Sequence, residues 1–238
     1  MQLVFIILII AAVAVAIGLA VREQACLRDK RRKELAGWAR ANGLKFLPEN
    51  DYSIGFRYQP FKCLQQGNNR YGCNIMVGTS GHRVMCGFDY HSETNAASSH
   101  GLHPGRQDHF SAVVVDAGFP LKPLSIRPQG LLDKVTEFVG FDGIDFESAE
   151  FSQRFAVKSP DRRWAYDVLH QKTLELMLDC PRFHVDFQGT QVAAYSGHAE
   201  FSPGEFESAL NLVTGILDNL PESVASELKG ISTGGATS

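Results

Sequence analysis

The strongest hydrophobic pattern in the chain is an uninterrupted apolar segment near its N-terminus. Residues 3–21, LVFIILIIAAVAVAIGLAV, contain neither a charged residue nor a proline. At a rise of about 1.5 Å per residue, a helix of this length spans about 28 Å, close to the thickness of the hydrocarbon core of a bilayer. Residues 1–21 are therefore predicted to form a transmembrane anchor.

A cleaved signal peptide is the alternative, because Gly18 and Ala20 are small enough for a cleavage site. No lysine or arginine precedes the apolar segment, however. The segment is also longer than the apolar region of a usual signal peptide, which has about 7–15 residues. Both observations favour an uncleaved anchor.

The next segment, 22–43, combines basic residues with a helical pattern. Leu35, Trp38 and Ala39 recur at the spacing of one helix face, and Gly43 is suited to end the helix. This helix and the apolar segment could be continuous.

Residues 44–155 change to the pattern of a β-rich lobe. Two β-rich runs in 70–90 flank a turn at Gly78 to Gly81, and a further run covers 110–118. The run 123–128 is bounded by prolines, which predicts an edge strand. The polar stretch between His91 and His109 has no apolar period and is predicted to be a long loop. These features predict an antiparallel sheet.

Residues 156–228 predict a second lobe made of a strand, a helix, a hairpin and a further helix. The first helix covers about 161–178, and the hairpin covers 183–196 with its turn at Gln188 and Gly189. Ser202, Pro203 and Glu205 form a capping box before an amphipathic helix. Residues 229–238 have no pattern and are predicted to be disordered. The fold class is α+β, with the two sub-lobes dividing near residue 155.

Charge gives this arrangement an orientation. Six basic and two acidic side chains give residues 22–33 a net charge of +4, and because the whole chain carries −3, residues 34–238 carry −7. Basic residues beside a membrane helix stay on the cytoplasmic side. We therefore expect a single-pass protein of the inner membrane, with its N-terminus outside and its acidic domain in the cytoplasm. The residues predicted to meet the bilayer surface are Arg22, Arg28, Lys30, Arg31, Arg32 and Lys33.

The acidic domain also excludes classes of partner. Nucleic-acid binding asks for basic patches, which this charge distribution disfavours. Neither a phosphate-binding G-x-x-x-x-G-K-[ST] loop nor a strand followed by G-x-G-x-x-G occurs, so nucleotide binding by those motifs is excluded. The G-x-S-x-G motif of serine hydrolases is absent as well. No cofactor is predicted, catalytic residues remain unknown, and an enzyme is the less favoured class.

Carboxylates in the stretch GIDFESAEF form the first candidate for chemistry. Asp145 and Glu147 alternate with Ile144 and Phe146, so in a strand the carboxylates would share the face turned to solvent. Catalysis would require one of them to be desolvated. Asp142, Asp145, Glu147 and Glu150 are therefore interpreted as a solvated surface rather than an acid/base or metal site.

The histidine-rich loop is the second candidate. His91, His100, His103 and His109 supply imidazoles, and His100 and His103 have the spacing H-x-x-H. Zinc motifs of hydrolases hold their histidines on a helix, which this loop lacks. A mobile polar loop is favoured, and the alternative is a metal-dependent hydrolase that uses the loop 91–109 with Asp89 or Asp108.

The stretch 146–178, FESAEFSQRFAVKSPDRRWAYDVLHQKTLELML, resembles the sequence pattern of a protein family. The residues that match this pattern are Phe146, Glu147, Ser148, Glu150, Phe151, Phe155, Val157, Asp161, Ala165, Leu169, Leu176 and Met177, with Gly81, Val84, Phe88, Asp89 and Tyr90 earlier in the chain. In this pattern the chain resembles an uncharacterised family of bacterial membrane-anchored proteins. The resemblance implies a location and a fold type, and it supplies no activity and no catalytic residue.

These observations predict a membrane-anchored cytoplasmic binding or scaffolding domain. Its expected partners are the lipid bilayer and another membrane or cytoplasmic protein. The metal-dependent hydrolase is the alternative, and a lipid-sensing domain is a third reading.

Overall fold

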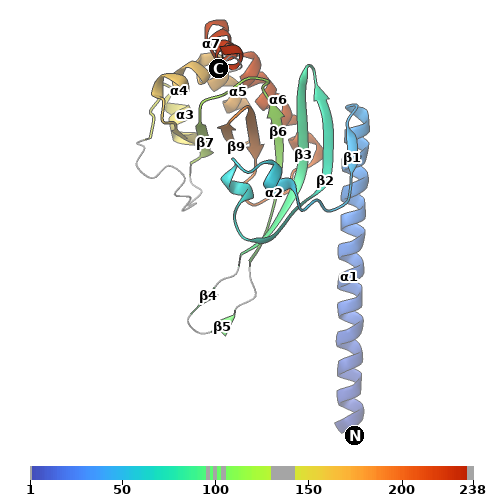
Figure 1. Cartoon of the computed structure of the whole chain (residues 1–238). Helices are drawn as coiled ribbons and strands as arrows, with labels where there is room; N and C mark the ends of the chain where they lie inside the picture. The colour runs from blue at the N-terminus through green and yellow to red at the C-terminus, as the bar shows by residue number, and fades with distance from the viewer. Residues whose placement is uncertain (1, 95–96, 99–100, 103–105, 130–142, 235–238) are drawn as a thin grey trace.

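The computed structural model describes residues 2–94, 97–98, 101–102, 106–129 and 143–234. It consists of a long N-terminal helix, an eight-stranded antiparallel sheet beside it, and further helices on the sheet (Figure 1). This architecture confirms the predicted α+β class.

Helix α1 runs without a break from Gln2 to Ala41. It joins the predicted transmembrane segment to the predicted helix beyond it and ends just before Gly43, whose φ of 68° favours glycine. Its C-terminal part docks on the domain, where Leu35 and Ala39 are fully buried and Trp38 packs against Phe206. The apolar part is long enough to cross a membrane, has a mean hydropathy of 1.7, and is not covered by the domain.

The sheet has the strand order β1-β2-β3-β6-β10-β9-β7-β8, and each neighbouring pair is antiparallel. The strands are β1 (Lys45–Leu47), β2 (Asn68–Ser80), β3 (Arg83–Thr94), β6 (Arg106–Asp116), β7 (Leu124–Pro128), β8 (Phe155–Lys158), β9 (His184–Gln188) and β10 (Gln191–Tyr195). A two-stranded ribbon of β4 (Ala97–Ser98) and β5 (Gly101–Leu102) lies at the tip of the β3–β6 hairpin. Strands from both predicted lobes share the large sheet, and the lobe boundary stays a prediction.

Both predicted hairpins are found, but the first turn is shifted. Gly78, Thr79 and Ser80 were predicted in the turn and are instead paired with β3. Gly81 between β2 and β3 has a φ of 59°, and Gly189 between β9 and β10 has a φ of 61°. Glycine has no Cβ to resist this left-handed conformation. These two hairpins set the register in the centre of the sheet.

One face of the sheet is covered by helices. They are α3 (Ala149–Arg154), α4 (Arg162–Val168), α5 (Gln171–Asp179), α6 (Pro203–Asp218) and α7 (Glu222–Gly234), together with the end of α1. Helix α6 begins with the predicted capping box, in which the Ser202 and Glu205 side chains satisfy each other's backbone amides. The opposite face is covered over its centre by α2 (Ile54–Arg57) and the short 3₁₀ helix η1 (Lys62–Leu64).

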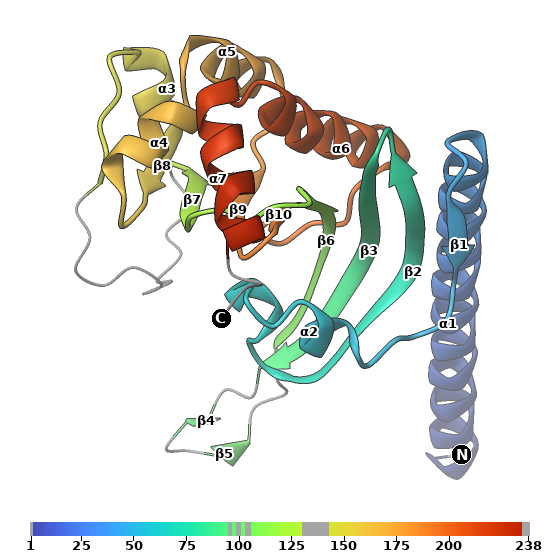
Figure 2. The same ribbon diagram turned by 45° about the horizontal axis from the view of Figure 1, so that its top comes forward.

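The two ends of the domain differ in what they contain. Figures 1 and 2 both show the β4–β5 ribbon on the side toward which the N-terminal half of α1 extends. Helices α3 to α6 lie at the opposite end of the domain. If α1 crosses a bilayer, these helices are the part of the domain farthest from it.

Several predicted elements differ from those observed. Strand β7 is not an edge strand, because β8 and β9 pair with its two sides; its terminal prolines bound it without breaking either ladder. Residues 143–148 form no strand, because Ile144 donates the one backbone hydrogen bond that joins this segment to β8. The helix predicted over 161–178 is two helices separated at Leu169 and His170.

The predicted loop 91–109 and the predicted tail also need correction. Strand β3 continues to Thr94 and β6 begins at Arg106, so the ends of the loop belong to a long hairpin. The side chains there are polar, and His91 and Ser92 are buried although both are polar. Helix α7 continues past Leu228 to Gly234, beyond the point where disorder was predicted, with Leu228 buried as its anchor.

Candidate functional site

The junction between α1 and the sheet is built around one ion pair. Arg31 on α1 donates two hydrogen bonds to Asp89 on β3, from Nε to Oδ2 at 2.9 Å and from Nη2 to Oδ1 at 2.7 Å. The Asp89 side chain is 3% exposed and that of Arg31 is 21% exposed. A two-pronged arginine–carboxylate contact of this kind fixes orientation as well as distance.

Two neutral donors complete the surroundings of the Asp89 carboxylate. Asn74 on β2 donates from Nδ2 at 2.8 Å, and Ser111 on β6 donates from its hydroxyl at 2.5 Å. Asn74 has a φ of 51°, so an irregular stretch of β2 presents its side chain. A buried carboxylate requires such partners, because an unpaired charge would be strongly disfavoured in the interior.

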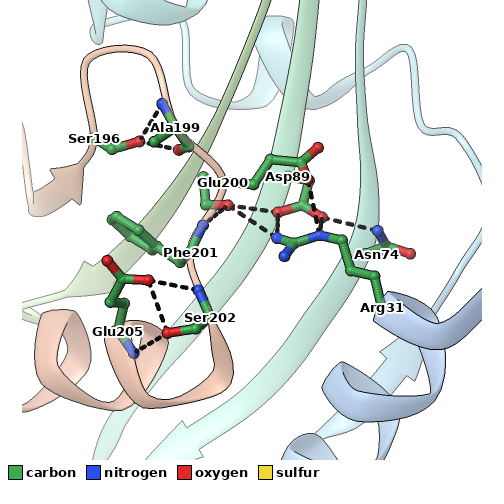
Figure 3. Close-up of polar contacts among 10 residues, drawn as sticks. Arg31, Asn74, Asp89, Ser196, Ala199, Glu200, Phe201, Ser202 and Glu205 are labelled. Atoms are coloured by element: carbon green, nitrogen blue, oxygen red, sulfur yellow. Dashed lines mark hydrogen bonds and ion pairs between the residues drawn. The ribbon is translucent and has the colours of Figure 1, made fainter. Parts of the chain in front are cut away.

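The same junction reaches the loop that precedes α6. Glu200 lies 3.1 Å from Arg31 Nε (Figure 3). The amide of Phe201 donates to the Ser111 hydroxyl at 2.8 Å. The α6 capping box follows immediately in the chain, as Figure 3 also shows. The network therefore joins α1 to three strands and to the start of α6.

Electrostatics at this junction favour the charged arginine. Burial lowers the pKa of Arg31, but its hydrogen bonds and attraction to Asp89, with the further attraction of Glu200, outweigh that effect and raise the pKa. Nearby, burial and then the negative charges of Asp89 and Glu200 raise the pKa of the Cys73 thiol to about 12. Cys73 is thus a protonated, unreactive thiol near neutral pH.

The residues predicted to meet the bilayer surface separate into two groups. Arg31 is held by the domain. The remaining predicted residues are exposed along α1, and their contact with lipid stays a prediction: Arg22, Arg28, Lys30, Arg32 and Lys33. The sequence marked Arg31 as basic and close to the membrane but gave no sign of its partner, which lies 58 residues away.

Two of the predicted metal-binding histidines come together, on the helix-covered face of the sheet. His91 Nδ1 lies 3.2 Å from His109 Nε2, and His91 Nε2 lies 3.4 Å from Glu93. His100 and His103 fall outside the described residues. Among the residues that are described, no group of three or more His, Cys, Asp or Glu side chains could hold a metal ion.

The two acidic residues considered with these histidines have other surroundings. Asp89 is engaged by Arg31, and Asp108 lies 3.9 Å from His198. Asp108 projects from β6 on the face opposite His109, because neighbouring residues of a strand point to opposite faces. The described part of the chain therefore does not place either carboxylate with the histidine pair.

The carboxylates of the GIDFESAEF stretch stay at the surface. Asp145, Glu147 and Glu150 are exposed, while Ile144 is buried beside β8. Asp142 lies outside the described residues. The exposed side chains agree with the predicted solvated surface, although the backbone there is not a strand.

A polar cavity that the sequence did not reveal lies on the face of the sheet opposite the helices. Its volume is about 80 Å³, and its lining includes Arg127, His184, Tyr195 and His198. Beside it, the Tyr195 hydroxyl donates to Asp186 at 2.8 Å. Burial raises the pKa values of both Asp186 and Tyr195.

Together, the fold and the junction define an α+β protein whose membrane-capable helix is locked onto an antiparallel sheet. No family model matches the chain, and no curated protein matches it. A solved structure with a similar fold is the crystal structure of the mycobacterial trehalose monomycolate transport factor A, TtfA. The TM-score is 0.59 at 10% sequence identity, and the match covers 80% of this chain and 94% of that one.

At this identity the likeness concerns the fold alone. It supports a fold shared with a mycobacterial protein, while the family suggested by the 146–178 pattern stays an expectation. The residues of that pattern are mainly packing residues, since Phe151, Phe155, Ala165 and Met177 are all buried.

Proposed function

We propose that this protein is a membrane-anchored binding or scaffolding module and serves as an accessory of a transport system. Its N-terminal helix spans the inner membrane, and its α+β domain lies in the cytoplasm and holds a partner protein there. The observation that carries the proposal is the continuous helix α1, apolar and uncovered at one end and fixed to the domain by Arg31 and Asp89 at the other.

This construction places the domain at a defined distance from the bilayer. Residues 22–30 are helical and exposed, so they form a spacer of about 13 Å between the apolar segment and the docked part of α1. The bidentate contact at Arg31 prevents the domain from turning about the spacer. A fixed distance and orientation suit a protein that presents a surface to a membrane-bound partner, whereas a purely soluble binding domain would not need them.

The transport role is supported by the fold. The structure of similar fold is named a transport factor. In such a system, a binding module fixed close to the bilayer can hold the components of a transport complex together without catalysing a reaction.

Affinity purification from native membranes tests this function. The full chain is solubilised in mild detergent and recovered, and associated proteins are quantified by mass spectrometry. We expect at least one membrane or cytoplasmic protein to be enriched with the wild-type chain. Ala25→Pro should reduce that enrichment because proline breaks the exposed spacer helix. Ala25→Leu, which preserves the helix, should not.

The result that contradicts the proposal is recovery of the intact, folded chain with no protein above background. Equal enrichment by the two Ala25 variants would contradict the requirement for a continuous helix while leaving partner binding in place.

A further inference from the structure

A groove of about 580 Å³ lies between α4, α5 and the segment that leads into α3. This volume falls in the usual range of binding pockets, about 300–1,000 Å³. The side chains that line it are Phe146, Glu147, Ser148, Tyr166, Leu169, His170, Gln171, Leu174, Glu175 and Leu178.

Helix α5 presents one of its two apolar faces to this groove. Gln171, Leu174, Glu175 and Leu178 are spaced at i, i+3, i+4 and i+7, so they lie along one side of the helix. The other apolar side packs inward through Met177, which is 1% exposed. Leu174 and Leu178 are only partly buried, so the groove side of α5 is incompletely covered by the described part of the chain.

Aromatic side chains form the opposite wall. Phe146 packs edge-on against Tyr166 with ring centroids 5.2 Å apart. The Tyr166 hydroxyl donates to the backbone carbonyl of Asp145 at 3.1 Å, which fixes the ring, yet Tyr166 remains 47% exposed. An exposed, oriented tyrosine beside leucines is typical of an anchoring position in a protein interface.

The charged side chains of the groove are acidic. Glu147 and Glu175 lie on opposite walls, and no lysine or arginine is among its described lining residues. His170 is held by a hydrogen-bonding contact of 2.7 Å with the Asn219 carbonyl. A ligand that fits must therefore combine an apolar face with positive charge.

We propose that this groove binds an amphipathic helix of a partner protein, with the apolar side of that helix on Leu174, Leu178 and Tyr166 and its lysines or arginines beside Glu147 and Glu175. This is the helix-in-groove mode of recognition. The inference rests on the proposed function and names the chemistry of the partner. Helices α4 and α5, which line the groove, lie at the end of the domain away from the N-terminal half of α1 (Figures 1 and 2). This position favours a protein partner over the bilayer.

Fluorescence anisotropy with defined peptides tests this inference. The probe is a labelled 18-residue peptide with leucines at i, i+3, i+4 and i+7 and lysines elsewhere. It is compared with a peptide of the same composition without an apolar face, and with one in which glutamate replaces lysine. The protein is the full chain in an uncharged detergent, and signal from empty micelles is subtracted.

We expect the amphipathic basic peptide to bind more tightly than both control peptides. The double variant Glu147→Lys/Glu175→Lys should weaken binding at least tenfold, and added salt should weaken wild-type binding because the charges are screened. Glu207→Lys, the same type of charge reversal at one exposed site on α6, is the control for charge reversal away from the groove and should bind like wild type. Tyr166→Ala should also weaken binding, through lost apolar contact.

Equal binding by wild type, the double variant and Glu207→Lys would overturn the inference, as would equal binding of the acidic peptide. Either result, combined with partner recovery from native membranes, would show that the groove is not the binding site of the partner and would leave the proposed function unaffected. Failure of partner recovery would instead count against the function itself.

Discussion

Asp89 is the buried carboxylate that Arg31 of α1 contacts. It is a carboxylate in a strand between Phe88 and Tyr90, both of which are fully buried on the other face. Transfer of an ionised carboxylate from water costs several kcal/mol, which is offset only when good partners surround it. Arg31, Asn74 and Ser111 supply these partners from three different elements.

Replacing Arg31 by alanine should therefore destabilise the protein by about 2–4 kcal/mol, since Asp89 would remain buried without its cation. The measurement is thermal or denaturant unfolding of the full chain in detergent. Lys30→Ala is the matched control: Lys30 is exposed, its ion pair with Glu34 is a surface pair, and removing it should cost no more than about 0.5 kcal/mol. Equal effects of the two substitutions would show that the Arg31 contact does not stabilise the junction.

Asp186 should make the stability of the folded protein depend on pH. Burial raises the pKa of Asp186 in the folded state. As the pH rises above the ordinary pKa of aspartate, the unfolded chain loses this proton while the folded protein still holds it. The folded state therefore becomes less stable relative to the unfolded state as the pH rises. Asp186→Asn should therefore be more stable than wild type at pH 7, and the advantage should shrink below about pH 4, where the carboxyl is protonated in both states.

The melting temperature measured across this pH range checks the prediction, and each kcal/mol corresponds to about 2–4 °C for a chain of this size. The amide can still accept the Tyr195 hydrogen bond. Glu207→Gln, at an exposed site, should show no such trend. A lower melting temperature for Asp186→Asn at pH 7 would mean that the charged carboxylate stabilises the fold.

At the scale of elements, α2 is held against the sheet by a close approach at Gly72. Gly72 exchanges two backbone hydrogen bonds with Asp51, at 2.7 and 2.9 Å. A Cβ at Gly72 would lie 2.7, 3.3 and 3.4 Å from three side-chain atoms of Ile54, which is fully buried on α2. The glycine is needed because it leaves room for α2.

Gly72→Ala should consequently destabilise the protein by about 1–3 kcal/mol, through overpacking that displaces α2. Unfolding of the variant by denaturant measures the loss. In Gly204→Ala the new methyl group meets nothing within 4 Å, and alanine is favoured over glycine in the helix, so that control should not lose stability. Wild-type stability in Gly72→Ala would show that α2 can shift without cost.

Element boundaries show what the sequence could predict and what it could not. Strongly periodic or capped segments were found correctly, such as α6 with its Ser202 capping box and the hairpin that turns at Gly189. Residues 143–148 alternate like a strand, but a strand requires a neighbouring ladder, which pattern alone does not supply. At the break between α4 and α5, His170 contacts the Asn219 carbonyl, a tertiary contact that the sequence does not reveal.

The candidate sites were harder to predict for the same reason. Arg31 and Asp89 were both noticed, one as a lipid contact and the other as an alternative metal ligand, yet their pairing joins residues far apart in the chain. The groove on α5 was not predicted, because a half-exposed leucine and a buried one look identical in sequence.

For the whole molecule, the decisive feature is that the apolar segment and the domain are connected by one rigid helix. The orientation of α1 in a membrane would therefore determine the orientation of the whole domain. If α1 crosses the bilayer, the β3–β6 hairpin extends toward the membrane and helices α3 to α6 face away from it (Figure 1).

The most direct test of this account is the location of the C-terminal domain in living cells. A dual reporter that distinguishes the cytoplasm from the outside of the inner membrane is fused after Ser238, and the fusion is followed in the membrane fraction. The account predicts a membrane-bound, full-length fusion whose reporter is active in the cytoplasm. A reporter active only outside, or a fusion released after cleavage near residue 20, would contradict it.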